Sequence, residues 1–150
     1  MHKILLIPTS TPPLVGIYKD NKLISSNKLE SQLSDSLVSF FCDLKEQGIL
    51  FNELFYVNGP GSYMALKLTY IFAKTLYIVN GVKLHSANGF YFNNNTPIKA
   101  YGNYYFAYEN DEVKLIKSNK NIYSNYTLPD VLNESIFGDD LEPLYILPAV

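Results

Sequence analysis

A buried strand that continues through a glycine-rich turn into a long apolar helix limits what this chain can fold into. Residues 54–57 are uniformly apolar, as expected of a strand covered on both faces, and they lead directly into Asn58-Gly59-Pro60-Gly61-Ser62. The helix predicted next, from about 63 to 79, has few polar positions. A helix of this kind has to be buried on most sides, so a sheet and other helices must pack around it.

Hydrophobic periodicity predicts four further strands and one further helix. The apolar run at 4–7 predicts a central strand, and two short runs around the turn-forming pair Asp20-Asn21 predict a hairpin. Between 27 and 48 the apolar residues recur at helical spacing, and Gly48 marks the stop. The predicted strands are 4–7, 15–18, 22–24, 54–57 and 82–85, and the predicted long helices lie within 27–48 and 63–79.

The polar stretch 93–97 sets a boundary between two predicted lobes. It follows a short helix predicted at 88–92. Beyond it, residues 104–109 and 113–117 alternate in polarity around a turn and predict an antiparallel hairpin. The predicted domains are an N-terminal lobe of residues 1–97, which carries the long helices, and a thin second lobe of residues 98–150.

Composition and charge exclude several classes of protein. With 47% hydrophobic and 17% charged residues, the chain has the composition of an ordered globular protein. A formal charge of -2 and a pI near 5.6 argue against a protein that grips nucleic acid unaided. Cys42 is alone, which fits a reducing cytosol, and we expect it to be packed inside the first helix. The opening apolar run is too short for a signal peptide, so a cytoplasmic location is expected.

Tyrosines form a regular stripe on the second predicted helix. Tyr63, Tyr70 and Tyr77 recur every seven residues, in a chain with thirteen Tyr, nine Phe and no Trp. Large rings with a polar tip suit surfaces that a partner buries, although AT-rich codon usage produces the same excess. Two interpretations stay open: the stripe packs in the chain's own core, or it meets a helix of another subunit. Lys67 and Lys74 argue against a membrane span.

The glycine turn is a weak signal for chemistry when taken by itself. Gly59-Pro60-Gly61-Ser62 can hold an anion, because glycines let backbone N–H groups approach a ligand at a helix start. It lacks the spacing of a phosphate loop, and a tight turn with Ser62 as helix cap explains it equally well. The only histidines, His2 and His85, stand in no metal-binding arrangement. We therefore expect no metal and no cofactor.

Three landmarks, in the same order along the chain, resemble the TsaB (YeaZ) family. Residues 55–67 look like its signature, in which Gly-Pro-Gly-Ser-aromatic is followed by Thr-Gly-aliphatic-Arg. Residues 4–11 resemble its opening apolar strand followed by Asp-Thr-Ser-Thr. The segment Leu141-Glu142-Pro143-Leu144-Tyr145-Ile146 is similar to its closing Ala-Glu-Pro-aliphatic-Tyr-Leu. Residues 98–140 match loosely and are fewer than in typical members, so the resemblance is to a shortened form.

The resemblance implies an α/β fold of the actin-like, sugar-kinase-like (ASKHA, ribonuclease H-like) kind. It has a five-stranded mixed sheet with helices and a reduced second lobe. It also implies a non-catalytic scaffold in the bacterial system that adds threonylcarbamoyl to the adenosine next to the tRNA anticodon. In that family the protein pairs through a helical bundle with a catalytic paralogue, TsaD, and a small ATPase, TsaE, engages the pair. Alone, it forms a homodimer through the same surface, and tRNA is bound only within the complex.

Several positions depart from the family pattern. Pro8 stands where related nucleotide-binding folds place an acidic residue, so a carboxylate for the metal is lost. Met64 and Ala65 replace the expected Thr-Gly, and Lys67 replaces Arg. We therefore do not expect metal-assisted ATP hydrolysis at the glycine turn.

We expect the partner or dimer interface to lie on the two long helices. The alternative is an enzyme of the same superfamily, a nucleotide phosphohydrolase or peptidase that uses the Gly-Pro-Gly-Ser turn. A stand-alone tRNA-binding module is disfavoured by the acidic pI. The expected interface residues are Leu33, Leu37, Phe41, Tyr63, Leu66, Tyr70, Phe72, Lys74 and Tyr77, and the family-motif loop consists of Asn58, Gly59, Pro60, Gly61 and Ser62.

Overall fold

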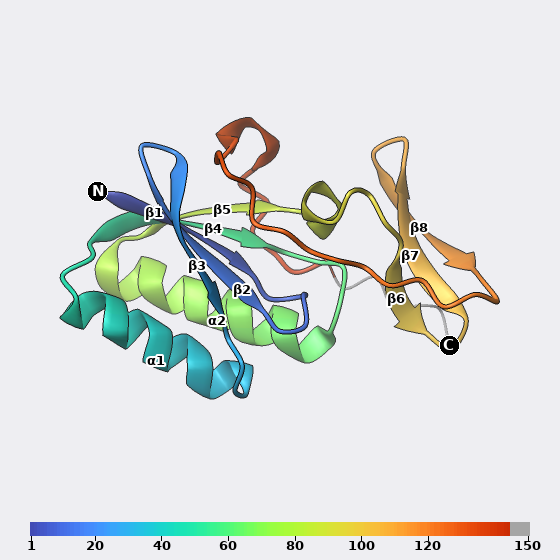
Figure 1. Ribbon diagram of the computed structural model, residues 1–150, viewed down its shortest axis with the longest axis horizontal. Helices are drawn as coiled ribbons and strands as arrows, with labels where there is room; N and C mark the ends of the chain where they lie inside the picture. The colour runs from blue at the N-terminus through green and yellow to red at the C-terminus, as the bar shows by residue number, and fades with distance from the viewer. Residues whose placement is uncertain (145–150) are drawn as a thin grey trace.

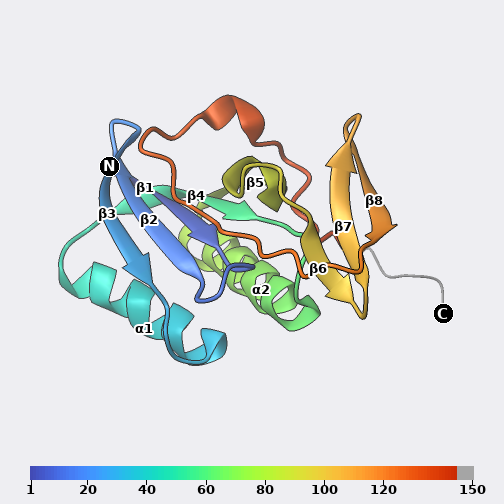
Figure 2. The same cartoon turned by 45° about the vertical axis from the view of Figure 1, so that its right-hand side comes forward.

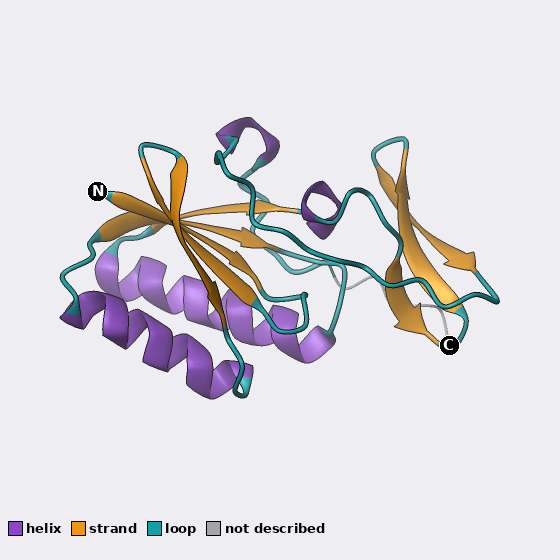
Figure 3. Ribbon diagram, viewed as in Figure 1, coloured by secondary structure: helices purple, strands orange, loops and turns teal. Residues whose placement is uncertain are grey.

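The structure is a computed structural model that describes residues 1–144, and in these residues two β-sheets accompany two long helices (Figure 1). Both long helices lie on one face of the larger sheet, and the smaller sheet stands apart at one end of the molecule (Figure 3). The larger sheet has the order β3-β2-β1-β4-β5 and the smaller one β6-β7-β8. The elements are β1 (His2–Ile7), β2 (Leu14–Lys19), β3 (Lys22–Lys28), α1 (Leu33–Glu46), β4 (Phe51–Val57), α2 (Tyr63–Asn80), β5 (Lys83–Ala87), η1 (Gly89–Phe92), β6 (Ile98–Tyr101), β7 (Tyr104–Glu109), β8 (Glu112–Lys117) and η2 (Glu134–Ile136).

β1 occupies the centre of the larger sheet. It pairs antiparallel with β2 and parallel with β4, and β4 pairs parallel with β5. Parallel neighbours need a crossover connection, and a long helix accordingly precedes both β4 and β5. α1 connects β3 to β4, and α2 connects β4 to β5. The predicted five strands with mixed pairing are confirmed.

Two tight hairpins have the turn residues that such turns require. Asp20 and Asn21, between β2 and β3, have φ values of 52° and 61°. Asn110 and Asp111, between β7 and β8, have φ values of 52° and 60°. Asp and Asn tolerate this left-handed conformation, which two-residue hairpins need at both central positions. Both predicted hairpins are confirmed, whereas β6 is an additional strand that the sequence analysis did not predict.

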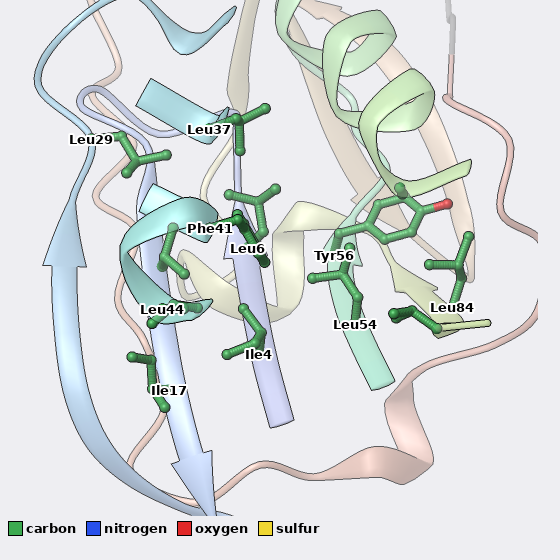
Figure 4. Close-up of a cluster of buried hydrophobic side chains, with 13 residues drawn as sticks. Ile4, Leu6, Ile17, Leu29, Leu37, Phe41, Leu44, Leu54, Tyr56 and Leu84 are labelled. Carbon is green, nitrogen blue, oxygen red and sulfur yellow. The ribbon is translucent and has the colours of Figure 1, made fainter. Parts of the chain in front are cut away.

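The apolar run in β1 is explained by burial on both faces. Ile4 and Leu6 point toward the helices, Leu5 and Ile7 point to the opposite face, and all four side chains are fully buried. Side chains of α1 and β4 meet the first pair in the core shown in Figure 4. That core includes Leu37, Phe41, Leu44, Leu54 and Tyr56.

α1 lies within the predicted range 27–48 and begins at Leu33, the first residue of the predicted apolar stripe. β3 continues through Lys28, and the Leu29 N–H then donates to Pro13 O at 2.9 Å, so the helix starts only at Leu33. The expectation that Cys42 is packed is wrong, because Cys42 lies on the exposed side of this amphipathic helix. The periodicity thus located the helix, whereas β3 is longer than the predicted strand 22–24.

α2 has the predicted bounds and end signals. The Ser62 hydroxyl accepts a hydrogen bond from Ala65 N, and Gly81 ends the helix with φ of 69°. Along the described chain, no helix combines the length and hydrophobicity that crossing a membrane requires.

The chain after β8 returns to the larger sheet and covers the face opposite the helices (Figure 2). Leu132 is 2% exposed in this layer, and the ring of Phe137 packs edge-on against Phe55 with centroids 4.9 Å apart. Backbone bridges join Lys22 to Val131 and Ser86 to Gly138. The domain division between residues 97 and 98 stays a prediction. Residues 126–138, which belong to the predicted second lobe, pack on the sheet of the first lobe.

Replacing Phe137 with alanine tests this second layer. Phe137→Ala should lower the free energy of unfolding by about 2 kcal/mol, because the variant loses ring contacts with Phe55 and Phe92. Urea unfolding followed by circular dichroism measures the change. Tyr123→Ala is the control, since Tyr123 is 77% exposed, and an equal loss in both variants would contradict the packing role.

Candidate functional site

The three family-like landmarks meet at the carboxyl end of β4. Asn58, the first residue after β4, is 7% exposed, and its Nδ2 donates to Asp140 O at 3.3 Å and to Glu142 O at 3.4 Å. Leu144 N donates to Asn58 O at 2.8 Å. The closing landmark is thus tied to the turn that starts α2, while its Tyr145 and Ile146 lie outside the described residues.

The two glycines of the turn allow other groups to come close. Gly59 has φ of 123°, and a Cβ there would lie 3.3 Å from Leu144 O. A Cβ on Gly61 would lie only 2.6 Å from Thr9 Cγ2 in the loop after β1. The space next to the Gly61 backbone is therefore filled by Thr9, so the turn serves as packed structure rather than as an open cradle for phosphate.

A double-mutant cycle tests the Gly61–Thr9 contact. Gly61→Ala should cost about 1 to 3 kcal/mol of unfolding free energy, because the new methyl overpacks the loop. The same change in a Thr9→Ser background should cost less, since the serine lacks Cγ2. Thermal unfolding of the four proteins gives the coupling energy, and strictly additive costs would contradict the contact.

A cleft of about 440 Å³ opens between the larger sheet and the smaller one, beside this turn. Its lining contains eight hydroxyl-bearing side chains and one lysine, and no Asp, Glu, His or Cys is among the residues that line it. Burial raises the pKa of the Tyr126 phenol, so this group stays neutral at physiological pH. The lining residues are Thr9, Ser10, Thr11, Gly61, Ser62, Ile98, Lys99, Tyr105, Asn121, Ile122, Tyr123, Ser124 and Tyr126.

Four ionisable residues outside the cleft form a cluster that ties the C-terminal layer to the sheet. Lys3 Nζ lies 2.8 Å from Glu134 Oε2 and 3.7 Å from Glu53 Oε2, and His85 Nε2 lies 3.1 Å from Glu53 Oε1. Asn21 Nδ2 also donates to Glu134 Oε2 at 2.8 Å. His85 therefore has a structural partner, and no group of His, Cys, Asp and Glu side chains within residues 1–144 is arranged to hold a metal.

This cluster predicts a pH-dependent stability. Hydrogen bonds from Lys3 and Asn21 lower the pKa of Glu134 below its ordinary value of 4.5. The stabilising contribution of the carboxylate is then complete above pH 4.5 and is lost as the pH falls through the lower folded-state pKa. Glu134→Gln should therefore reduce stability at neutral pH and flatten its decline in acid, as urea unfolding at several pH values would measure. The exposed Glu112→Gln variant is the control, and a parallel decline in wild type and Glu134→Gln would refute the coupling.

The nine expected interface residues fall into three groups. Leu37, Phe41 and Leu66 are at most 9% exposed, so their assignment to a partner surface is corrected: Leu37 and Phe41 pack in the core against the sheet, and Leu66 is buried as well. Leu33 and Phe72 are partly buried against the same core. The remaining four, Tyr63, Tyr70, Lys74 and Tyr77, lie along one side of α2.

Lysines and tyrosines alternate along that side of α2. Lys67 Nζ lies 5.9 Å from the centre of the Tyr63 ring. Lys74 Nζ lies 5.7 Å from the Tyr70 ring centre and 5.6 Å from that of Tyr77. Each ammonium group is thus in cation–π range of a ring. Tyr63 and Tyr77 remain about half exposed, at 51% and 54%, whereas Tyr70 is less exposed.

The most exposed apolar stripe on α2 is one that the sequence analysis left out of the interface. Met64, Ile71 and Ile78 are 60%, 52% and 76% exposed and recur every seven residues. Their spacing was visible in the sequence, beside the tyrosine stripe. Only the position of the sheet decides how far each stripe is exposed, and this information periodicity does not contain.

Comparison with known proteins establishes the fold. No protein-family model matches the chain, and no curated protein matches it in sequence. Among solved structures it is similar to YeaZ from Pseudomonas aeruginosa, with a TM-score of 0.59 at 12% identity, over 82% of this chain and 66% of that one. It is also similar to an uncharacterized protein with similarity to peptidase YeaZ from Pseudomonas aeruginosa, with a TM-score of 0.59 at 13% identity, over 78% of this chain and 64% of that one.

The chain therefore has an α/β fold with a five-stranded mixed sheet and two long helices packed on it. More particularly, the fold is of the YeaZ (TsaB) kind, and the chain spans just under two thirds of the length of these neighbours.

Proposed function

We propose that this protein is a TsaB-like scaffold without catalytic activity of its own, with the actin-like form of the fold. It binds a TsaD-like catalytic paralogue through the outward face of α1 and α2. In this role it serves, in the cytoplasm, the complex that adds threonylcarbamoyl to the adenosine next to the tRNA anticodon. A TsaE-like ATPase engages the pair, and tRNA is bound only by the assembled complex.

The exposed stripe of Met64, Ile71 and Ile78 is the observation that carries this proposal. Large apolar side chains at a seven-residue spacing on a helix are typical of a surface that packs against another helix. The flanking Tyr63 and Tyr77 add half-exposed rings, which are enriched where binding energy is concentrated.

The charges of the two helices support a homodimer when the chain is alone. α2 carries Lys67 and Lys74 and no acidic residue, whereas Asp35, Asp43 and Glu46 are exposed on α1. A two-fold axis between copies brings the same surface of each chain together, so α2 of one copy can face α1 of the other. The positive charges of α2 and the negative charges of α1 therefore make this surface electrostatically complementary to a second copy of itself.

The lining of the cleft supports the non-catalytic part of the proposal. A phosphohydrolase or peptidase needs a base or a metal-activated water near its nucleophile. The cleft beside the Gly-Pro-Gly-Ser turn is lined by hydroxyls, amides and Lys99, without a carboxylate or imidazole. Thr9 also fills the space next to Gly61 where a phosphate would approach the backbone.

A matched pair of isoleucine variants tests the interface. Ile71→Glu places a charge in the middle of the α2 stripe and should weaken self-association and binding of a coexpressed TsaD-like protein from the same genome. The expected loss is at least about tenfold in affinity, because a buried anchor contributes about 2 kcal/mol or more. Size-exclusion chromatography with light scattering measures both.

Ile24→Glu is the control, since Ile24 is 55% exposed on β3, almost the same as the 52% of Ile71. The proposal fails if the unmodified chain stays monomeric and does not bind the TsaD-like protein, or if both variants bind as the parent does.

A further inference from the structure

A pocket separate from the cleft between the sheets lies on the face of the larger sheet that is opposite the long helices (Figure 2). One wall consists of the end of η1 and the adjoining Asn94, and the other is the returning segment 127–137. Its volume of about 300 Å³ is at the lower end of the range of sites that hold small molecules. The pocket therefore has room for a compound of one or two rings, and the sequence analysis predicted no site here.

Backbone hydrogen bonds hold the two walls of this pocket in place. Thr127 N donates to Phe92 O at 2.9 Å, and Leu132 N donates to Asn21 O at 2.8 Å. Phe92 and Leu132 are buried at the floor of the pocket, and the Phe137 ring lies against that of Phe92 with centroids 5.9 Å apart. The apolar floor is thus formed in the free protein, so a ligand does not have to order it.

The rim of the pocket is polar and uncharged. Tyr91, Asn94, Thr127 and Asn133 are exposed there, and they supply a phenol, two amides and a hydroxyl. Asn133 Oδ1 accepts hydrogen bonds from Ser135 N at 3.2 Å and from Ser135 Oγ at 2.6 Å. Its Nδ2 has no hydrogen-bond partner among the described residues, so two N–H donors remain for a ligand.

The charges around the pocket select against an anion. Among the described residues that line it there is no Lys, Arg, His, Asp or Glu. The segments that form its walls, residues 91–94 and 127–137, contain two charged residues, Asp130 and Glu134, and both are acidic. A phosphate or carboxylate would lose its water here without gaining a cation, which is unfavourable. A cation would likewise meet no lining carboxylate, so the lining favours a neutral ligand.

We propose that this pocket binds a neutral, planar heteroaromatic compound that carries a hydrogen-bond donor and an acceptor. Its ring lies on the apolar floor and contacts Phe92 and Phe137 in the offset or edge-on arrangements that aromatic rings prefer. Its polar edge faces the rim, where Asn133 donates and the Asn94 amide both donates and accepts. The site is on the other face of the sheet from the α2 stripe and does not depend on the proposed function.

Nuclear magnetic resonance titration of the full chain with three matched compounds tests the site. Nicotinamide is a neutral planar ring with a carboxamide, nicotinate has a carboxylate in place of the carboxamide, and cyclohexanecarboxamide has the carboxamide on a ring that is not aromatic. We expect saturable binding of nicotinamide, with amide shifts at residues 91–94 and 127–137. Nicotinate should bind at least about tenfold more weakly, because its carboxylate is desolvated without a cation. Cyclohexanecarboxamide should bind at least about threefold more weakly, because it lacks the contacts between aromatic rings.

Two asparagine variants localise the binding. Asn133→Asp keeps the oxygen that accepts from Ser135 N, but it removes both N–H donors and adds a negative charge. It should weaken the binding of nicotinamide at least about fivefold, through the lost hydrogen bond. Asn103→Asp makes the same change at an exposed position between β6 and β7 and should leave the binding unchanged. Thermal unfolding checks that both variants are folded, and Ile71→Glu should bind nicotinamide as the parent does even if it abolishes association through α2.

The proposal is overturned if nicotinamide does not bind saturably, if nicotinate or cyclohexanecarboxamide binds as tightly, or if the two asparagine variants weaken binding equally. Amide shifts confined to residues 9–11, 61–62 and 121–124 would place the compound in the cleft between the sheets and would also overturn it.

Discussion

Burial of β1 on both faces is the constraint from which the arrangement of the rest of the chain follows. Leu5 and Ile7 need cover on one side, and Ile4 and Leu6 need cover on the other. The helices supply the second cover, and the chain that returns after β8 supplies the first. In the sequence, the strands of the smaller sheet lie between the helices and the segment that returns after β8. The cleft between the two sheets is therefore a consequence of covering the central strand.

The same arrangement leaves α2 with more apolar surface than this chain buries. The sheet covers the side that contains Ala73, and Phe72 packs against Phe41 of α1 with ring centroids 4.8 Å apart. The third side, with Ile71 and Ile78, has no cover among the described residues and is more than half exposed. In a monomer, an exposed apolar stripe of this regularity promotes aggregation, whereas in a subunit it is buried against a partner.

The elements could be predicted from sequence where local chemistry decides them. The hairpin at Asp20 and Asn21 follows from turn propensity, and the bounds of α2 follow from the cap at Ser62 and from Gly81, whose left-handed φ ends the helix. The burial of β1 on both faces followed from its unbroken apolar run. In each case the signal lies within a few residues of the feature.

The remaining features depend on contacts between distant segments. Leu37, Phe41 and Leu66 were assigned to an interface because helical spacing shows a stripe but not the direction of the sheet. The return of residues 126–138 depends on the packing of Leu132 and Phe137 against β1 and β4, and the cleft is lined by β6 and by the loop after β1, which are distant in sequence. No local pattern in the sequence predicts these contacts between distant segments.

Hydrogen exchange of α2, with and without a TsaD-like protein from the same genome, tests the central claim most directly. If the outward face of α1 and α2 is the binding surface, amides within Tyr63–Asn80 become more protected on mixing, and those of β7 and β8 do not change. Unchanged exchange throughout α2 in a complex that demonstrably forms would contradict the account and place the partner on another face.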